Sequence, residues 1–217
     1  MRQLPLEISG RAAPTFENFV AGANAEALAR LKGLAAGELR ESIVYLWGEP
    51  GSGRSHLLRA AARANPQLVV ADDVESLDAA AQQRLFSAIN AAREGQAAVL
   101  AAGRLPPAQL ALREDLRTRL AWGLVYQLRP LSDADKAAHL RAEAARRGLH
   151  LADDVANYLL TRLPRDLASL NRVLDRLDRH SLSRQRPLSL ALVREALQQD
   201  AADEKTTSPG GSPPGAG

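Results

Sequence analysis

Apolar and polar positions follow two different patterns along the chain. Four short apolar runs, residues 43–47, 68–71, 97–102 and 125–128, predict buried strands. Between them, residues 24–35, 55–64 and 79–94 carry apolar side chains three and four positions apart and predict amphipathic helices. Strands that alternate with helices in this way favour an α/β domain with a parallel sheet and helices on both of its faces.

The pattern changes after residue 129, where no further strand is predicted. Ser132 is a suitable N-cap for a helix that ends near residue 147, and residues 153–163, 166–180 and 189–199 predict three more helices. We therefore expect a mobile arm over residues 1–13, an α/β domain over 14–129 and a small all-α domain over 130–200. The segment 201–217 is rich in Gly, Pro and Ser and is expected to be disordered.

Composition limits the classes of protein to consider. The chain has 217 residues, 46% hydrophobic and 24% charged, as in ordinary globular proteins. It has no cysteine, so disulfides and thiol chemistry are excluded, and its four histidines show no metal-ligand spacing. No apolar run is long enough to span a membrane, so we expect a cytoplasmic protein with no membrane partner. The net charge of +3 is too small to indicate nucleic-acid binding by itself.

The clearest chemistry follows the first apolar run, in the segment GEPGSGRS at residues 48–55. It fits the phosphate-binding loop pattern G-x-x-x-x-G-K-[ST] except that Arg54 stands where lysine is expected, and the two side chains are not interchangeable. Glycines let the backbone wrap around phosphate oxygens, and the start of the next helix favours an anion. The candidate nucleotide-binding residues are Gly48, Gly51, Ser52, Gly53, Arg54, Ser55 and His56. A plain glycine turn between strand and helix is the competing interpretation.

A second element of a nucleotide site follows the second apolar run. This run ends in Asp72 and Asp73, where one carboxylate can hold a Mg²⁺ ion and the next can polarise an attacking water. We assign Asp72 and Ser55 to the metal and Asp73 to the base. The cofactors expected are therefore ADP or ATP together with Mg²⁺. Taken alone, the two acids would equally suit a solvated turn at the end of a strand.

Several segments together resemble the AAA+ core of the DnaA initiator family, and more closely the DnaA-related Hda family. The resemblance covers residues 14–199. It rests on GSGRSHLL, on LFSAINAAREG followed by AAGRLPP, on DLRTRLAWGLVYQLRPLSDADK and on LPRDLASLNRVLDRL. The N-terminal segment QLPL at residues 3–6 is similar to the motif with which the Hda family docks on the DNA sliding clamp. The fold implied is an AAA+ α/β domain followed by a helical lid.

The resemblance also implies roles for single residues. It makes Arg119 the arginine finger offered to a neighbour's nucleotide, and Arg165 the second sensor arginine of the lid. Gln3 would hydrogen-bond at the mouth of the clamp groove, while Leu4 and Leu6 would fill its pocket. The partners implied are the sliding clamp, DnaA, and DNA indirectly through the clamp. The sequence leaves open whether the protein also forms a homo-oligomer.

The chain departs from the family pattern in two places. Only twelve residues, 56–67, separate the phosphate-binding loop from the acidic strand, too few for the strand and helix that DnaA-like proteins carry there. We therefore expect one edge strand to be missing, which leaves residues 68–71 at the edge of the sheet. Arg104 stands where the family places a small polar or acidic sensor residue, a second change in the nucleotide site after Arg54.

These observations lead to a main hypothesis and two alternatives. The main one is a negative regulator of replication initiation that binds the clamp and stimulates ATP hydrolysis by DnaA through Arg119. The first alternative is an autonomous AAA+ ATPase that remodels or loads a protein partner with its own Asp73. The second is an adaptor that binds a partner without nucleotide. No DNA-reading domain follows the lid in this sequence, so direct sequence-specific DNA binding is not expected.

Overall fold

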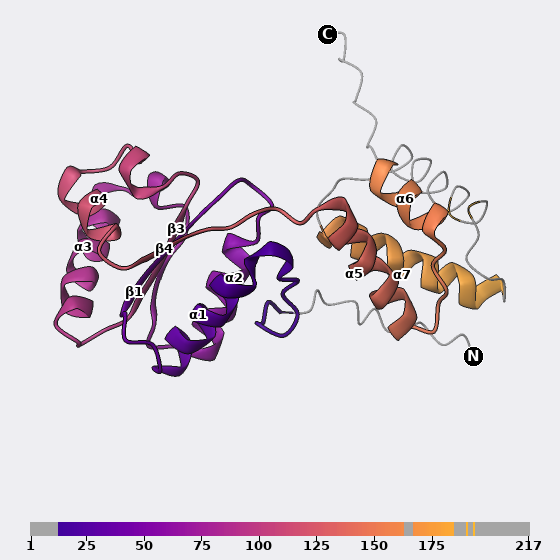
Figure 1. The fold of residues 1–217 in the computed structure, drawn as a ribbon, viewed down its shortest axis with the longest axis horizontal. Coiled ribbons are helices and arrows are strands. Elements are labelled where there is room, and N and C mark those ends of the chain that lie inside the picture. Colours follow the sequence, from indigo (N-terminus) through magenta and orange to yellow (C-terminus); the bar gives the residue numbers. More distant parts are fainter. Residues whose placement is uncertain (1–12, 163–166, 185–189, 191–192, 194–217) are drawn as a thin grey trace, which may run out of the picture. The chain divides into compact units, whose positions relative to one another are not determined.

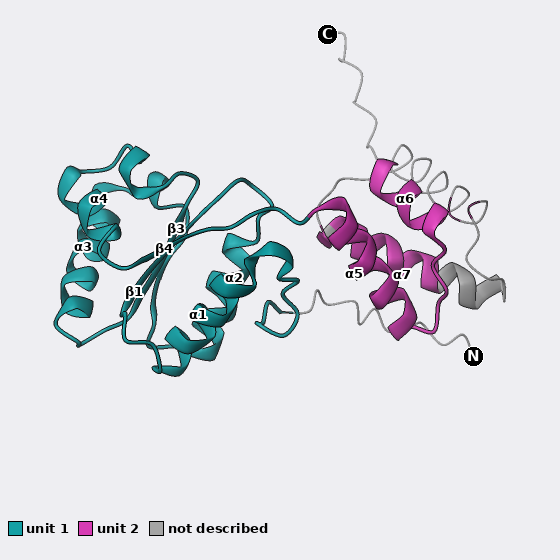
Figure 2. Ribbon diagram, viewed as in Figure 1, with its two compact units in different colours: residues 1–131 teal, residues 132–217 magenta. Residues whose placement is uncertain are grey.

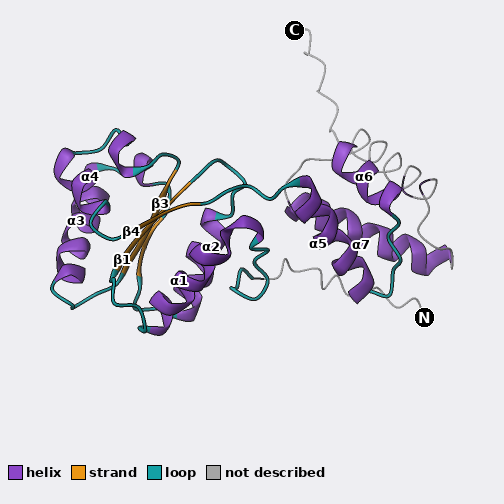
Figure 3. Ribbon diagram, viewed as in Figure 1, coloured by secondary structure: helices purple, strands orange, loops and turns teal. Residues whose placement is uncertain are grey.

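A computed structural model of the protein describes residues 13–162 and 167–184, together with residues 190 and 193. The chain divides into two compact units, residues 1–131 and 132–217. Figure 2 distinguishes the two units by colour, and Figure 3 shows that the strands belong to the first unit and that the second is helical.

The first unit is built on a four-stranded sheet made of β1 (Ile43–Trp47), β2 (Val69–Ala71), β3 (Val99–Gly103) and β4 (Leu124–Gln127). The spatial order is β2-β3-β1-β4, and every pair is parallel. The central strand β1 is bonded on both sides, with Tyr45 opposite Ala101 of β3 and Val125 of β4. The predicted parallel α/β sheet is therefore confirmed.

Two pairs of helices cover the two faces of this sheet (Figure 1). One pair is α1 (Ala25–Ala36) with α2 (Arg54–Ala64), and the other is α3 (Ala79–Arg93) with α4 (Glu114–Leu120). Side chains of β1 alternate between the faces, so Val44 and Leu46 pack with α1 and α2 while Tyr45 packs with α3 and α4. Short 3₁₀ turns occupy Gly22–Asn24, Val74–Ser76 and Pro107–Gln109.

Strand β2 lies at an edge of the sheet formed by the described residues, as expected from the short link before it. Helix α2 ends at Ala64 and β2 begins at Val69, which leaves no room for a further strand and helix between them. The three residues of β2 are only half-buried, whereas every residue of β3 is buried. The missing edge strand therefore leaves the acidic end of β2 at the margin of the sheet.

The predicted boundaries shift by one or two residues at several elements. The last strand begins one residue early, at Leu124, directly after Gly123. A Cβ on Gly123 would lie only 2.0 Å from the carbonyl oxygen of Ile43, so glycine allows β4 to approach β1 closely at this point. The first helix begins with the 3₁₀ turn at Gly22 rather than directly at Asn24, which instead bonds the backbone of Arg129.

The second unit is all-α, as predicted, with helices α5 (Asp133–Arg146), α6 (Asp153–Arg162) and α7 (Leu167–Arg184). Ser132 caps α5 through a reciprocal capping box with Asp135, an interaction that stabilises a helix by about 1 kcal/mol. Helix α7 continues past the predicted end at residue 180, since no Gly or Pro follows before residue 187. The hydrophobic core of the second unit includes Leu140, Ala144, Val155, Leu159, Leu170, Leu174, Leu177 and Val193.

Some predictions fall on residues that the structure does not describe. These are the N-terminal arm, most of the helix predicted at 189–199 and the tail 201–217. Within the part of the chain that is described, no helix is both long and apolar enough to cross a membrane.

We expect the helical unit to lose stability as the pH falls below about 6.5. Burial lowers the pKa of His139 from its usual value of 6.5, and Arg146 and Arg147 act in the same direction, while the hydrogen bond to Asn171 opposes them. The unfolded chain therefore takes up the proton at a higher pH than the folded unit. The free energy of unfolding then decreases as the pH falls through that window.

Thermal unfolding at about pH 7.5 and about pH 5.5, compared with the variant His139→Gln, checks this expectation. The glutamine keeps a polar group facing Asn171 but cannot titrate. An identical pH dependence in both proteins would show that His139 does not contribute.

Candidate functional site

The loop between β1 and α2 is shaped by two close contacts at glycines. A Cβ on Gly48 would lie 2.3 Å from the carbonyl oxygen of Leu128, and one on Gly53 would lie 2.6 Å from the ring of Phe19. Gly53 also has a φ of 97°, a left-handed conformation that favours glycine. The plain backbone at both positions lets the loop curl back above the end of β1, as a loop that surrounds phosphate oxygens must do.

Two buried polar atoms of this loop lack a partner among the described residues. They are the hydroxyl oxygen of Ser52 and one terminal guanidinium nitrogen of Arg54, and the two residues are 4% and 8% exposed. Buried polar atoms in proteins are almost always hydrogen-bonded, so such orphans at the start of a helix fit an anionic ligand. The residues present therefore suit a nucleotide phosphate, and Gly48, Gly51, Ser52, Gly53, Arg54 and Ser55 would hold it.

Arg54 reaches from this loop to the acidic turn after β2. Its Nη2 atom lies 3.3 Å from Oδ1 of Asp73, and the arginine is 8% exposed while the aspartate is half-exposed. Since β3 lies between β1 and β2, the guanidinium must pass the carboxyl end of β3 to make this ion pair. The structure thus brings together the unusual loop residue and the candidate base, a contact that the sequence did not reveal.

The acidic turn has a strained backbone at the same residue. Asp73 has a φ of 43°, the one non-glycine residue with positive φ in the described part of the chain. The Oδ1 atom of Asp72 accepts a hydrogen bond from the backbone N–H of Asp73 at 3.0 Å. Within the described ranges no three His, Asp or Glu side chains form a cluster that could hold a metal ion. The assignment of Ser55 and Asp72 to Mg²⁺ stays a prediction that depends on phosphate and water as further ligands.

Arg104 follows directly after the end of β3. The last residue of the strand is Gly103, and a Cβ there would lie 2.3 Å from the Tyr45 hydroxyl and 2.7 Å from Oε2 of Glu75. The largely exposed side chain of Arg104 pairs with Glu75, its Nε lying 3.7 Å from Oε1, and its backbone N–H donates to the same oxygen at 2.9 Å. The Tyr45 hydroxyl donates to the carbonyl of Leu105 at 2.9 Å, and burial followed by the charge of Glu75 raises its pKa. Tyr45 and Glu75 thus occupy the space beside the nucleotide loop.

His56 joins the phosphate-binding loop to the segment that precedes α1. Its Nε2 atom lies 2.9 Å from the carbonyl oxygen of Thr15, close enough to donate a hydrogen bond. The rings of His56 and Phe19 lie 5.4 Å apart, and Phe19 also packs on Gly53. Phe16 is buried in the core shared by α1 and α2. His56 therefore acts in this structure as a link between chain segments beside the loop.

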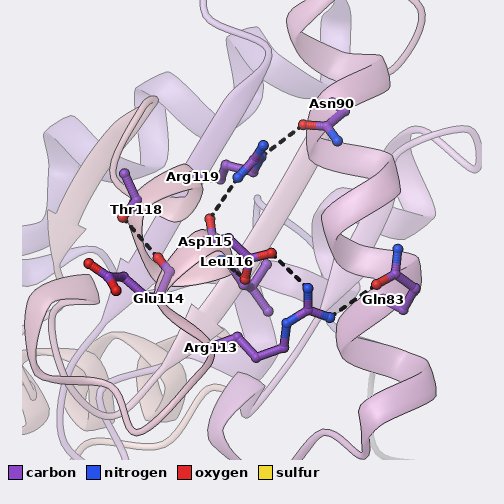
Figure 4. Close-up of polar contacts among 8 residues, drawn as sticks. All are labelled: Gln83, Asn90, Arg113, Glu114, Asp115, Leu116, Thr118 and Arg119. Atoms are coloured by element: carbon purple, nitrogen blue, oxygen red, sulfur yellow. Dashed lines mark hydrogen bonds and ion pairs between the residues drawn. The ribbon is translucent and has the colours of Figure 1, made fainter.

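Arg119, the candidate finger, lies in α4 and is held by residues of α3 (Figure 4). Its Nε atom donates to Oδ1 of Asn90 at 3.0 Å, and one terminal nitrogen donates to the backbone carbonyl of Asp115 at 3.2 Å. The guanidinium also lies 4.1 Å from the ring of Phe86 and 4.9 Å from the ring of Trp122. Because each such contact contributes about 0.5–1 kcal/mol, together they hold the arginine in one orientation.

The topology puts Arg119 and the phosphate-binding loop at opposite ends of the parallel strands. The loop follows the carboxyl end of β1, whereas the end of α4 leads through Trp122 to the amino end of β4. Arg119 is therefore turned away from the nucleotide loop of its own chain. Sequence reasoning identified Arg119 but missed Phe86 and Asn90, although both lie in the segment LFSAINAAREG that carried part of the resemblance.

Four predicted site residues lie outside the part of the chain that the structure describes. They are Gln3, Leu4 and Leu6 of the arm and Arg165 of the helical unit. Their roles stay predictions.

Comparison with known proteins agrees with this architecture. Residues 133–197 match the family model of the Hda lid domain. The structure is similar to domain III of the Thermotoga maritima replication initiation protein DnaA, with a TM-score of 0.68 and 20% identity over 87% of this chain and 97% of that one.

Two further solved structures share the fold. AMPPCP-bound DnaA from Aquifex aeolicus matches with a TM-score of 0.68 and 17% identity, over 90% of this chain and 70% of that one. A variant of Thermotoga maritima RuvB matches with a TM-score of 0.63 and 16% identity, over 86% of this chain and 72% of that one. With the fold of DnaA domain III and with residues 133–197 matching the lid domain of the Hda family, the chain is similar to Hda-like, DnaA-related AAA+ proteins.

Proposed function

We propose that this protein is a negative regulator of DNA replication initiation that stimulates ATP hydrolysis by DnaA. In this proposal Arg119 is inserted into the nucleotide site of an ATP-bound DnaA molecule, while Gln3, Leu4 and Leu6 tether the protein to a DNA-loaded sliding clamp. The observation that carries the proposal is the placement of Arg119. It is held in one orientation at the amino ends of the strands, whereas its own nucleotide loop lies at their carboxyl ends.

The chemistry of Arg119 follows from its contacts. An arginine supplied from a second protein stabilises the negative charge that develops on the transferred phosphoryl group, and accounts for about 10³–10⁵ in rate. Asn90 and the carbonyl of Asp115 use two donors of the guanidinium and leave the others free to face phosphate oxygens. A side chain that is already oriented loses less conformational entropy when it reaches its target. Asn90 and Phe86 are positioning residues in this scheme.

The protein's own nucleotide site has a supporting role. ADP or ATP would lie on the phosphate-binding loop, with Ser55 and Asp72 holding Mg²⁺ and Arg165 of the lid contacting the nucleotide. When bound, the metal would neutralise phosphate charge. The contact between Arg54 and Asp73 occupies the carboxylate that would otherwise polarise an attacking water. This supports a site with weak or no intrinsic hydrolysis.

The variant Arg119→Ala should reduce the stimulation of ATP hydrolysis by DnaA about 10³-fold, to the rate of DnaA alone. Hydrolysis is measured with DnaA and clamp-loaded DNA in the presence of each variant. Arg117→Ala, which removes a guanidinium two residues away on the same helix, serves as the matched control and should keep full stimulation. Asn90→Ala should lose part of the stimulation, because Arg119 would then lack its main acceptor. Normal stimulation by Arg119→Ala would refute the finger assignment.

The variant Arg54→Lys should raise ATP turnover by the isolated protein on the order of tenfold or more, since a positioned base contributes about 10²–10⁴-fold. Lysine restores a compact cation to the loop and releases Asp73. The double variant that adds Asp73→Asn should return turnover to the low starting level, and Arg59→Lys on the exposed face of α2 is the control. Robust turnover by the unmodified protein alone would instead favour an autonomous ATPase.

Alanine at Gln3, Leu4 and Leu6 together should abolish retention on immobilised sliding clamp. The polar head and the two apolar side chains are the groups expected to enter the clamp groove. Replacement of Glu7 by alanine in the same arm is the control and should not change retention. If the triple variant is still retained, the arm is not the clamp ligand.

A further inference from the structure

A groove of about 580 Å³ opens at the amino ends of the strands in the first unit. Its lining includes Arg40, Ile43, Arg93, Trp122 and Gly123. Ile43 begins β1, Gly123 immediately precedes β4, and Arg93 is the last residue of α3. The groove is therefore separate from the phosphate-binding loop. It lies at the same end of the strands as Arg119.

Trp122 joins this groove to Arg119. Trp122 is 42% exposed, and two guanidinium groups lie over its ring. The guanidinium carbon of Arg93 lies 4.4 Å from the ring, and that of Arg119 lies 4.9 Å from it. Trp122 thus presents a fixed apolar surface between the groove and the finger.

The groove also carries positive charge that is not balanced locally. Among the described residues no ion pair joins Arg40 or Arg93 to a carboxylate. Arg119 donates to an amide oxygen and a carbonyl oxygen and also interacts with the nearby carboxylate of Asp115. Glu41 is the acidic residue in the lining. The two arginines of the lining, Arg40 and Arg93, outnumber Glu41 and leave an excess of positive charge that attracts an anionic group.

We infer that this groove is a docking site for an acidic protein segment of the AAA+ partner whose nucleotide receives Arg119. The inference rests on the proposed function, because it takes the recipient of Arg119 as the occupant. An acidic side chain of the partner pairs with Arg93 and Arg40, and an apolar side chain beside it packs on Trp122. Buried tryptophan and arginine are the residue types that most often dominate protein–protein binding energy.

The shape of the site favours a protein segment over a nucleic-acid backbone. Single strands are bound by a row of cations that follows successive phosphates, whereas here two cations, Arg40 and Arg93, line one concave site. Glu41 in the lining would repel a continuous phosphate chain but tolerates a single acidic side chain that avoids it. A partner anchored at Trp122 also sets its position relative to Arg119, because the two side chains are in contact.

The first experiment observes Trp122 directly. The chain has two tryptophans, so protein labelled with 5-fluorotryptophan gives two ¹⁹F signals, and Trp47→Phe assigns the signal of Trp122. Addition of unlabelled ATP-bound DnaA should shift or broaden the Trp122 signal. Duplex DNA alone, at the same ionic strength, should leave it unchanged. A shift with DNA but not with DnaA would overturn the inference in favour of a nucleic-acid contact.

The second experiment measures binding of ATP-bound DnaA to charge-reversal variants. Arg93→Glu should weaken binding about tenfold or more, the loss expected for an interface residue of this kind, and the effect should shrink at high salt. Arg59→Glu has the same change of charge on α2, which covers the other face of the sheet, and should bind normally. Trp122→Phe keeps an aromatic surface and should bind better than Trp122→Ala. Equal affinity for Arg93→Glu and Arg59→Glu would overturn the inference.

The two proposals can fail separately. If Arg119→Ala abolishes stimulation while DnaA binding leaves the Trp122 signal and the Arg93→Glu affinity unchanged, the finger stands and the groove does not bind the partner. If DnaA binds at the groove but its hydrolysis does not respond to Arg119→Ala, the groove stands and the proposed function fails.

Discussion

Strand β1 is the constraint on which the first unit depends. It is hydrogen-bonded to β3 on one side and β4 on the other, and Val44, Tyr45 and Leu46 are fully buried between two layers of helices. Its carboxyl end leads directly into the phosphate-binding loop, and its amino end forms part of the groove at Trp122. A strand of five residues is about 16 Å long, so β1 separates the loop from the groove by that length.

This separation gives two arginines opposite environments. Arg54 is buried and paired with a carboxylate, so its charge is balanced inside its own nucleotide site. Arg119 donates to two neutral oxygens and lies beside two aromatic rings, so its orientation is set without a direct ion pair to a carboxylate. The first arrangement suits a site that binds nucleotide and hydrolyses it poorly, and the second suits a cation that is offered to another molecule.

The missing edge strand also affects the acidic turn of the protein's own nucleotide site. Without it, β2 becomes a short, half-buried edge strand that ends in the acidic turn. A residue at such a margin is restrained by fewer neighbours, and Asp73 is half-exposed with a positive φ. The ion pair with Arg54 restrains the carboxylate, and it does so from the loop that would hold the phosphates.

Much of the architecture could be predicted from the sequence because its signals are local. Apolar runs and helical spacing gave the strand–helix alternation and the all-α second unit, since hydrophobic periodicity reflects which side of each element is buried. The short link before Asp72 predicted the missing edge strand, because chain length limits what a crossover can contain. Glycine spacing located the phosphate-binding loop, and motif resemblance singled out Arg119.

Only the tertiary structure decided which of these residues meet. The pairing of Arg54 with Asp73 depends on β3 lying between β1 and β2, an order that no local pattern encodes. Asn90 and Phe86 are ordinary helix residues in the sequence, and they become partners of Arg119 because α3 and α4 pack side by side. The groove at Trp122 likewise needs the ends of β1, α3 and α4 to converge. Local sequence determined the elements of this protein, whereas contacts between residues far apart in the chain determined its sites, because side-chain partners are selected by packing in three dimensions.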